Sequence, residues 1–277
     1  MEVSVLRHSA GFDIFTVRSG QNEVVLSAFG GQILNWTRAG VPIMFANEER
    51  AILDGKTPYR GGAPICFPQF SKGALLPSAT EVLPQHGRAR TSIWDAEIRE
   101  QDNALIFRTE QPSAEGFGPT VFACELKYVF HEGVRMEARI TNVGEAASPF
   151  QFAIHSYWAS ENPGSVTVEG MGERFLDNLA GLSEAVDADS SSPHTPPFDR
   201  VYLDDSDRQK LTAERYILDI STENCAGTVF WNPGPAHTIG DLGTPNFVCL
   251  ESGLITPSRT LQPSEEHLLV VEYHATT

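Results

Sequence analysis

The sequence predicts an all-β protein, a large antiparallel β-sandwich with few and short helices. Short runs of β-branched and aromatic residues recur along the chain, and pairs such as Ser-Gly, Gly-Gly and Ala-Gly separate them. Helical spacing of apolar residues at i, i+3 and i+4 is nowhere kept for more than about two turns. The 277 residues show no internal repeat and no low-complexity linker, so we expect a single domain over residues 1–277.

The strands are expected to follow one another through tight turns and two long loops. Asp102-Asn103 and His131-Glu132-Gly133 each separate two strand-like runs, as the loop of a β-hairpin does. The segments Asp54–Ser92 and Ser183–Asp199 are rich in Pro, Gly or Ser, and loops of that length are often functional. The expected strands are Phe12–Val17, Val24–Phe29, Ile33–Thr37, Pro42–Phe45, Ile93–Arg99, Ala104–Arg108, Phe122–Phe130, Val134–Thr141, Phe150–Trp158, Ser165–Glu169, Arg215–Ile220, Thr228–Trp231, Phe247–Glu251 and His267–Tyr273.

Charge and hydropathy exclude several classes of partner. A formal net charge of −16 argues against nucleic acid, because neutralising its phosphates needs a broad basic surface. No run approaches the roughly 18 consecutive apolar residues of a membrane span, and the N-terminus lacks the apolar core of a signal peptide. The sequence therefore predicts a cytoplasmic protein without a nucleic-acid or membrane partner, and we expect a monomer. Reduced thiols are expected for the four cysteines, which form no C-x-x-C pair: Cys66, Cys124, Cys225 and Cys249.

The segment from Gly55 to Trp94 is basic within this acidic chain. It holds five basic residues and the single acid Glu81, a net charge of +4 against −16 for the whole chain. Such an excess can seat an anion such as phosphate, which Arg contacts through a planar, bidentate fork. It can equally be a solvated loop whose charges pair with the acidic surface. The basic residues are Lys56, Arg60, Lys72, Arg88 and Arg90.

The neighbours of Arg60 and Arg90 favour these two as ligands of an anion. Arg60 precedes Gly61-Gly62, where the absence of a Cβ lets a ligand or backbone come close. Arg90 lies four residues after His86, in a stretch that also holds Gln85. A loop that only solvates charges has no need for histidine and tryptophan among them.

His155 has a setting that the other histidines lack. In the expected strand Phe150–Trp158, the two-residue period places Gln151, His155 and Tyr157 on one face and the large apolar residues on the other. A strand face with Gln, His and Tyr points to water or to a polar cleft. His155 is therefore either a candidate for proton transfer or a structural histidine.

Two acidic residues are candidates beside it. Glu251 ends an almost wholly apolar run, where partial desolvation would raise its pKa toward the range useful for a general base; alternatively it lies at an exposed strand end. Asp199 can bind hydroxyl groups of a ligand or pair with Arg200.

The sequence predicts no metal site. No H-E-x-x-H or comparable spacing occurs, and Asp204-Asp205-Ser206-Asp207 lacks the Gly and Glu of a calcium loop. The histidines expected in turns, at the surface or at strand edges are His8, His131, His194, His237, His267 and His274.

Six segments form an ordered set of motifs. They are Tyr59-Arg60-Gly61-Gly62-Ala63-Pro64-Ile65-Cys66-Phe67-Pro68-Gln69-Phe70, Pro84-Gln85-His86-Gly87-Arg88-Ala89-Arg90, Ile154-His155-Ser156-Tyr157-Trp158, Asp199-Arg200-Val201-Tyr202, Val229-Phe230-Trp231-Asn232-Pro233 and Phe247-Val248-Cys249-Leu250-Glu251. Together and in this order they resemble the hexose-6-phosphate mutarotases, relatives of the aldose 1-epimerases. The resemblance spans most of the chain, from about Gly30 to Glu251.

The resemblance implies a β-supersandwich of the galactose mutarotase type that needs neither metal nor organic cofactor. It implies interconversion of the α and β anomers of a hexose 6-phosphate, such as glucose 6-phosphate. His155 would protonate the ring oxygen, and Glu251 would take the proton from the C1 hydroxyl. The positions that match binding residues are Arg60 and Arg90 for the phosphate, and Gln85, His86 and Asp199 for the sugar hydroxyls.

Two residues depart from the family's pattern. Arg88 stands where an aromatic residue is usual, and Ser252 follows Glu251 where proline is frequent. Two other functions therefore stay open. The protein can be a 1-epimerase of unphosphorylated aldoses, or a non-catalytic sugar-binding or regulatory protein of the same fold.

Overall fold

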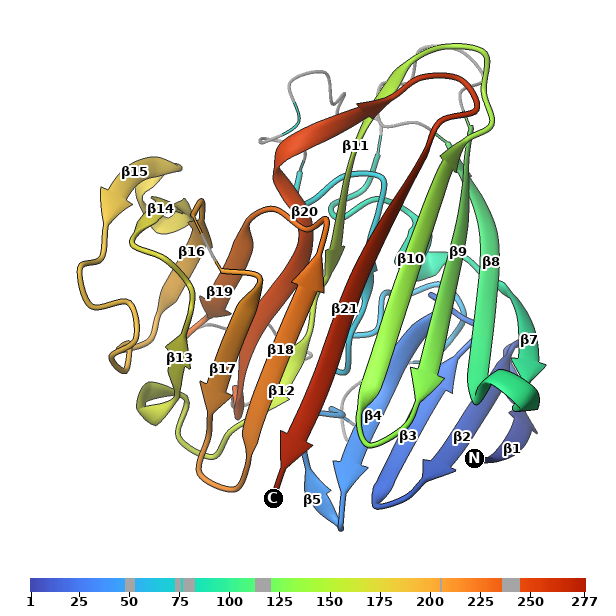
Figure 1. The fold of residues 1–277 in the computed structure, drawn as a ribbon, viewed down its shortest axis with the longest axis horizontal. Helices are drawn as coiled ribbons and strands as arrows, with labels where there is room; N and C mark the ends of the chain where they lie inside the picture. The colour runs from blue at the N-terminus through green and yellow to red at the C-terminus, as the bar shows by residue number, and fades with distance from the viewer. Residues whose placement is uncertain (48–52, 73–75, 77–82, 113–120, 205, 236–244) are drawn as a thin grey trace.

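The computed structural model describes residues 1–47, 53–72, 76, 83–112, 121–204, 206–235 and 245–277, and it confirms the all-β sandwich (Figure 1). Three sheets are formed, and the ladders between their strands are antiparallel. The helical segments of the described residues are single 3₁₀ turns: η1 (Ala89–Thr91), η2 (Glu100–Asp102), η3 (Pro163–Ser165) and η4 (Asn178–Ala180). Among these residues, no helix has the length and apolarity needed to cross a membrane.

The first sheet is the N-terminal one, and its strands lie side by side in chain order. Asn22 ties it to the neighbouring sheet, because its side-chain amide donates to the carbonyl of Glu132 at 3.2 Å. The five strands, blue in Figure 1, are β1 (Glu2–Arg7), β2 (Asp13–Ser19), β3 (Asn22–Ser27), β4 (Gln32–Arg38) and β5 (Val41–Pro42).

The second sheet has eight strands and runs across Figure 1 in the order β13-β17-β18-β21-β10-β9-β8-β7. Both expected hairpins, β7–β8 and β9–β10, are part of it. Buried and half-buried residues alternate along β10, the pattern of a strand with one face on a core. The bounds are β7 (Asp95–Arg99), β8 (Ala104–Pro112), β9 (Val121–Phe130), β10 (Val134–Asn142), β13 (Thr167–Glu169), β17 (Arg208–Thr212), β18 (Ile217–Glu223) and β21 (Glu266–Thr276).

The third sheet runs β15-β14-β16-β19-β20-β11-β6, and β12 also pairs with β20. The long strand β20 is its centre, because β19 occupies one of its edges while β11 and β12 share the other. The bounds are β6 (Ile65–Cys66), β11 (Ser148–Ile154), β12 (Tyr157–Ala159), β14 (Arg174–Asp177), β15 (Ser183–Val186), β16 (Phe198–Tyr202), β19 (Thr228–Asn232) and β20 (Phe247–Leu261).

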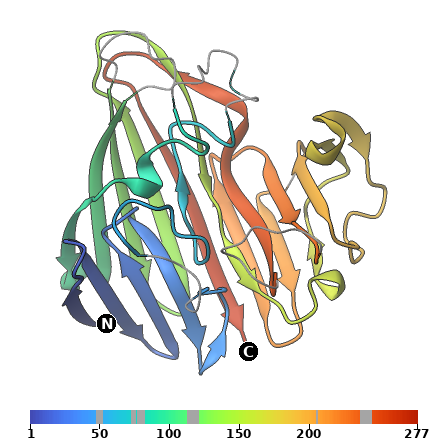
Figure 2. The same ribbon diagram turned by 180° about the vertical axis from the view of Figure 1, so that it is seen from behind.

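The second sheet forms one layer of the sandwich. The first and third sheets lie side by side and form the other layer (Figure 2). Aromatic rings join the layers. Phe15 of β2 meets Phe107 of β8 with ring centroids 5.7 Å apart, and Trp158 of β12 meets Tyr273 of β21 at 5.1 Å. These residues belong to one large buried cluster that draws on all three sheets.

The structure corrects the two expected loops. The segment Ser183–Asp199 is not a plain surface loop, since it begins with β15 and its end lies in β16. Asp187, within it, accepts a hydrogen bond from Arg200 Nη1 and contacts His194 Nε2 at 2.9 Å. Asp54–Ser92 contains β6 and η1, and its residues 73–75 and 77–82 lie outside the described ones.

Two histidines expected at the surface or at strand edges are buried. His194 packs on the ring of Phe230 at 5.3 Å, and Asp187 covers its Nε2. His267 is buried with its Nε2 3.1 Å from the carbonyl of Asn224. His237 lies outside the described residues. The four cysteines are free thiols, as expected.

Candidate active site

A cavity of about 350 Å³ opens on the third sheet, and all seven predicted site residues line it. They come from the segments before and after β6, from the break between β11 and β12, and from strands β16 and β20, which flank β19 in the third sheet. The seven are Arg60, Gln85, His86, Arg90, His155, Asp199 and Glu251. Ser71 and Asn178, which belong to no motif, line the same cavity together with the motif residues Phe70, Tyr157, Val229 and Trp231.

His155 lies where the expected strand Phe150–Trp158 is interrupted. β11 ends at Ile154 and β12 begins at Tyr157, and a turn in which the Ser156 N–H donates to Ile154 O separates them. The expected two-residue alternation is therefore wrong here, and Gln151 is not a cleft residue. Its amide is buried, accepting from the Phe70 N–H and donating to a backbone carbonyl of β20.

The interruption places His155 opposite Glu251. On the shared edge of β20, Ile154 of β11 pairs with Ser252 and Tyr157 of β12 pairs with Cys249. The two residues between the strands thus face the two residues of β20 that neither strand covers. His155 Nδ1 lies 3.5 Å from Glu251 Oε1 as a result.

The His155 imidazole is held as a neutral ring. It stacks on Tyr157 with centroids 4.8 Å apart, and Trp231 meets it edge-on at 5.7 Å. Burial lowers the pKa of His155 to about 3, and the positive charges of Arg90 and then Arg60 act in the same direction. The structural alternative for His155 stays compatible with its burial, but a ring that lines an open cavity can also exchange a proton with a ligand.

Glu251 is 1% exposed, so the alternative of an exposed strand end is wrong. Its Oε2 is buried and has no hydrogen-bond partner among the described residues. Burial raises the pKa of Glu251 well above its usual range; the charge of Asp199 raises it further, and Arg90 opposes the shift. A buried carboxyl with an unpartnered oxygen at a cavity is suited to proton transfer with a ligand hydroxyl.

The two arginines give the cavity its positive charge. Arg90, in η1, donates from Nη2 to the carbonyl of Gln85 at 2.7 Å, while its buried Nε has no partner in the described part of the chain. Arg60 lines the same cavity. Gly61-Gly62 serve backbone packing rather than ligand approach, because a Cβ on Gly62 would lie 2.1 Å from Ile33 O.

His86 provides a neutral hydrogen-bond donor. The Ser71 N–H donates to its Nδ1 at 3.2 Å, so the proton of the neutral ring is on Nε2, beside the Gln85 side chain. Burial lowers the pKa of His86 well below its usual range, and His155 and Arg90 act in the same direction. His86 therefore stays uncharged in the cavity wall, with its Nε2 3.2 Å from the Gln85 side-chain amide.

Asp199 does not pair with Arg200, which donates to Asp187 instead. Asn178 of η4 donates to Asp199 Oδ2 at 2.7 Å, and the two side chains line the cavity together. Burial raises the pKa of Asp199, and the Asn178 hydrogen bond counteracts part of this shift. Asn178 belongs to no motif and reaches the cavity only because β14 pairs with β16, so the sequence did not predict it.

Residues 13–274 match the aldose 1-epimerase family. The chain belongs to this family. It is 31% identical to the “Putative glucose-6-phosphate 1-epimerase” of Escherichia coli K12 over 257 residues. This aligned region covers 87% of this chain and 82% of that relative. A relative of the same name from Salmonella typhimurium is 31% identical over 272 residues, 92% of this chain and 86% of that one.

Solved structures show the same fold as this aldose 1-epimerase family member. A “putative mutarotase” from Salmonella typhimurium superposes with a TM-score of 0.83 at 24% identity, over 99% of this chain and 94% of that chain. A protein from Synechocystis sp. PCC 6803 superposes with a TM-score of 0.80 at 22% identity, over 95% and 96% of the two chains. The fold expected from the resemblance is confirmed.

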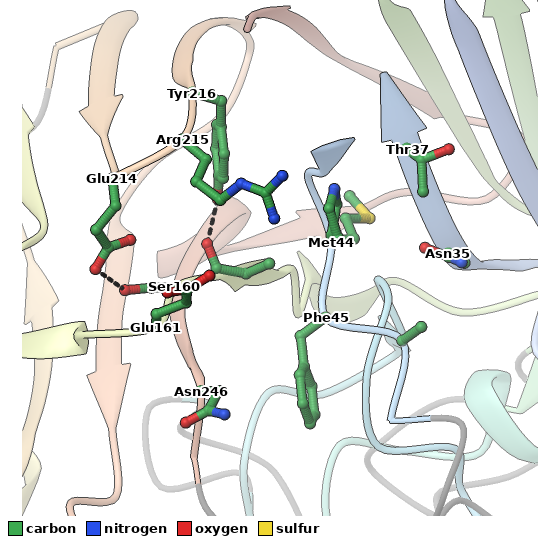
Figure 3. Close-up of a pocket in the computed structure, with 13 residues that line it drawn as sticks. Asn35, Thr37, Met44, Phe45, Ser160, Glu161, Glu214, Arg215, Tyr216 and Asn246 are labelled. Carbon is green, nitrogen blue, oxygen red and sulfur yellow. Dashed lines mark hydrogen bonds between the residues drawn. The ribbon is translucent and has the colours of Figure 1, made fainter. Parts of the chain in front are cut away.

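A second cavity of this family member, about 400 Å³, offers no comparable chemistry (Figure 3). Its carboxylate Glu214 already accepts from Ser160 Oγ at 3.1 Å and from the Asn162 N–H at 2.7 Å. The hydroxyl of Tyr216 donates to the carbonyl of Ala159 at 3.0 Å. These groups are satisfied within the protein, and none of the predicted site residues lines this cavity.

The fold also assembles a group of metal-type ligands that the sequence spacing did not reveal. His155, Cys249 and Glu251 each offer one ligand atom, and the three atoms lie within 4.8 Å of one another. Among the described residues, these three are the only set of at least three His, Cys, Asp or Glu side chains whose ligand atoms are close enough to bind one ion together. Sequence motifs missed it because two of the ligands come from β20 and the third comes from the break beside it.

Proposed function

We propose that the protein is a hexose-6-phosphate mutarotase, which interconverts the α and β anomers of glucose 6-phosphate or a related aldohexose 6-phosphate. One observation carries the proposal: the His155–Glu251 pair and two arginines line a single cavity of this aldose 1-epimerase family member. The two relatives at 31% identity both carry the name “Putative glucose-6-phosphate 1-epimerase”, which supports the same substrate.

The reaction requires two proton transfers and no nucleophile. One group takes the proton of the C1 hydroxyl while another protonates the ring oxygen, so that the bond from C1 to the ring oxygen breaks and the C1 aldehyde forms. Rotation about C1–C2 turns the aldehyde, and the reverse transfers close the ring as the other anomer. Each positioned proton transfer typically contributes about 10²–10⁴-fold to the rate.

His155 and Glu251 supply these transfers as a pair that holds one proton. Burial favours the proton on Glu251 over His155, because it raises the pKa of Glu251 well above its usual range and lowers that of His155 to about 3. Next to burial, the charges of Arg90 and Arg60 keep the imidazole neutral. A phosphate dianion bound to both arginines offsets these charges, which moves the proton toward His155 and leaves Glu251 as the base.

The remaining cavity residues position the sugar. Arg60 and Arg90 hold the phosphate at one end of the substrate, and the Arg90 Nε that lacks a partner is a donor available to it. His86 donates from Nε2 to a hydroxyl, with Gln85 beside it, while Asp199 accepts from another. Binding energy at the phosphate thus orients C1 toward the acid–base pair without taking part in the chemistry.

Arg88 gives no support to the alternative of an unphosphorylated substrate. Its side chain is exposed and does not line the cavity, so it does not reshape the wall where the family usually has an aromatic residue. Lys56 and Lys72 are exposed as well. The positive charge at the site comes from Arg60 and Arg90.

Exchange NMR between the anomers of glucose 6-phosphate, run beside glucose, tests the proposal. Acceleration of the phosphorylated sugar alone is the expected result. Equal acceleration of both sugars would assign the protein to the unphosphorylated aldoses. Binding of glucose 6-phosphate without acceleration of either exchange would leave a sugar-binding protein of the same fold.

A further inference from the structure

A thiol lies against the imidazole of the candidate acid–base pair. Cys249 Sγ is 3.6 Å from His155 Nδ1, the same nitrogen that lies 3.5 Å from Glu251 Oε1. Cys249 and Glu251 both belong to β20, two residues apart, so their side chains are on the same face of the strand. Anomer interconversion needs a proton donor and a proton acceptor but no sulfur. The proposed function therefore assigns no role to the Cys249 thiol.

The spacing of these three atoms suits a tetrahedral metal ion. With zinc bonds of about 2.0–2.1 Å to nitrogen and oxygen and about 2.3 Å to sulfur, neighbouring ligand atoms are about 3.3–3.6 Å apart. The two distances from His155 Nδ1 are 3.5 Å and 3.6 Å. Imidazole, thiolate and carboxylate together are the ligand set of a thiophilic divalent cation rather than of magnesium or calcium.

We propose that His155, Cys249 and Glu251 form an inhibitory site for a thiophilic divalent cation such as Zn²⁺ or Cd²⁺. The ion enters from the cavity, which reaches both His155 and Glu251. Cys249 is fully buried behind them and completes the ligand set from the sheet. The fourth coordination position faces the cavity and takes water or a hydroxyl of a bound sugar.

Ion binding stops catalysis because it consumes the groups that carry the proton. The imidazole lone pair and a carboxylate oxygen become metal ligands, and the Glu251 carboxyl and the Cys249 thiol each lose their proton to solvent. Neither His155 nor Glu251 can then exchange a proton with the sugar. The inhibition part rests on the proposed function, whereas occupation of the site by the ion does not.

Direct binding is measured first, with Cd²⁺ as the probe and without any sugar. The wild-type protein is expected to gain one thiolate-to-cadmium ultraviolet charge-transfer band per chain, and Cys249→Ala and Cys249→Ser are expected to lose it. Cys124→Ser and Cys225→Ser, outside the cavity, are the matched controls and keep the band. Absence of the band in the wild type, or its persistence in both Cys249 variants with retained thermal melting, overturns the site.

Inhibition is then measured as the ratio of exchange rates with and without Zn²⁺ for each variant. Because loss of an outer-sphere contact already costs about 10–100-fold in metal affinity, loss of the direct thiolate ligand should raise the inhibitory Zn²⁺ concentration at least about 100-fold. Chelation with EDTA should restore the wild-type rate in full. A chelator that lowers the rate of the purified protein, or equal Zn²⁺ sensitivity in Cys249→Ala and wild type, overturns the inhibitory role.

If no aldose is converted at all, the cadmium band still decides whether the ion site exists. A protein that binds Cd²⁺ through Cys249 but converts no sugar retains the metal site and loses the proposed function. A protein that converts glucose 6-phosphate but shows no Cys249-dependent band retains the function and loses the metal site.

Discussion

His155 Nδ1 lies 3.5 Å from Glu251 Oε1 because a two-residue interruption separates two strands that share one edge of β20. The pairs Ile154–Ser252 and Tyr157–Cys249 fix the register on each side of the interruption. The candidate acid–base pair is thus positioned by the sheet register. Glu251 lies on a strand, and His155 lies in a two-residue break that is paired strand on both sides, which holds its position more tightly than a long loop would.

Replacing Glu251 with Gln should abolish anomer exchange. The amide keeps the size of the side chain but cannot take the proton of the C1 hydroxyl, so kcat should fall at least about 10²–10⁴-fold. Binding of glucose 6-phosphate, followed by calorimetry, should change little because the arginines remain. Unchanged turnover in this variant would remove Glu251 from the mechanism.

The same substitution should stabilise the fold at neutral and higher pH. Because burial raises the pKa of Glu251 in the folded protein, its contribution to stability is present below the unfolded value of about 4.5 and is lost as pH rises through the folded pKa. Gln carries no such charge. In denaturant melts from pH 5 to 9, the free energy of unfolding of the variant should increase relative to that of the wild type as the pH rises.

Acid sensitivity of the fold should depend on His155. Its folded pKa of about 3 lies below the usual histidine value of 6.5, so between these pH values the unfolded chain binds a proton that the folded chain does not. Stability contributed by the neutral imidazole is present above pH 6.5 and is lost as the pH falls toward 3, by up to about 5 kcal/mol at 1.36 kcal/mol per unit.

Denaturant melts of His155→Gln across pH 3.5 to 7 check this dependence. The variant should lose less stability on acidification than the wild type, and the exposed His274→Gln, as control, should follow the wild type. Parallel curves for wild type and His155→Gln would show that the imidazole is not kept neutral by the fold. Exchange activity of His155→Gln should be lost, as for Glu251→Gln.

Local patterning was enough to predict seven of the eight strands of the second sheet, and β17 was missed. In β10, burial alternates along Val134–Asn142 as the apolar residues of the sequence do, because one face of the strand packs on the core and the other does not. Strands β1 and β15 were missed since nearly all of their residues are exposed or half-buried, which removes the apolar face that such patterning detects. Short edge strands of this kind form only once their partners are in place.

The sequence was enough to predict seven of the residues that line the cavity, but not how they are arranged in it. Motifs marked His155 and Glu251, but the interruption of the strand at His155 depends on its register with β20, which no local pattern encodes. Asn178 reaches the cavity through sheet pairing alone, so residue type gave no signal for it. Cys249 shares a strand face with Glu251, but its contact with His155 depends on the same register. Their roles, and those of all the cavity residues, stay predictions.

Arg90→Ala should weaken binding of the phosphorylated sugar with a smaller effect on kcat. A hydrogen bond to a charged group is worth about 1.5–3 kcal/mol, which corresponds to a rise in KM of roughly 10–150-fold for glucose 6-phosphate. Arg88→Ala is the matched control, since Arg88 is two positions away and exposed. Equal KM values in both variants would place the phosphate elsewhere in the cavity.

A free dianion should accelerate the exchange of unphosphorylated glucose. Burial keeps the pKa of His155 at about 3, and the charges of Arg90 and Arg60 assist it, so an anion that offsets these charges favours the protonated imidazole that the ring oxygen needs. Inorganic phosphite added to glucose and wild-type protein should therefore raise kcat/KM for glucose, and glucose 6-phosphate should compete with both. In Arg60→Ala/Arg90→Ala the phosphite effect should vanish, because the variant has no seat for the dianion. If phosphite leaves the wild-type rate unchanged while glucose 6-phosphate is still turned over, the phosphate group only anchors the substrate and does not alter the proton affinity of His155.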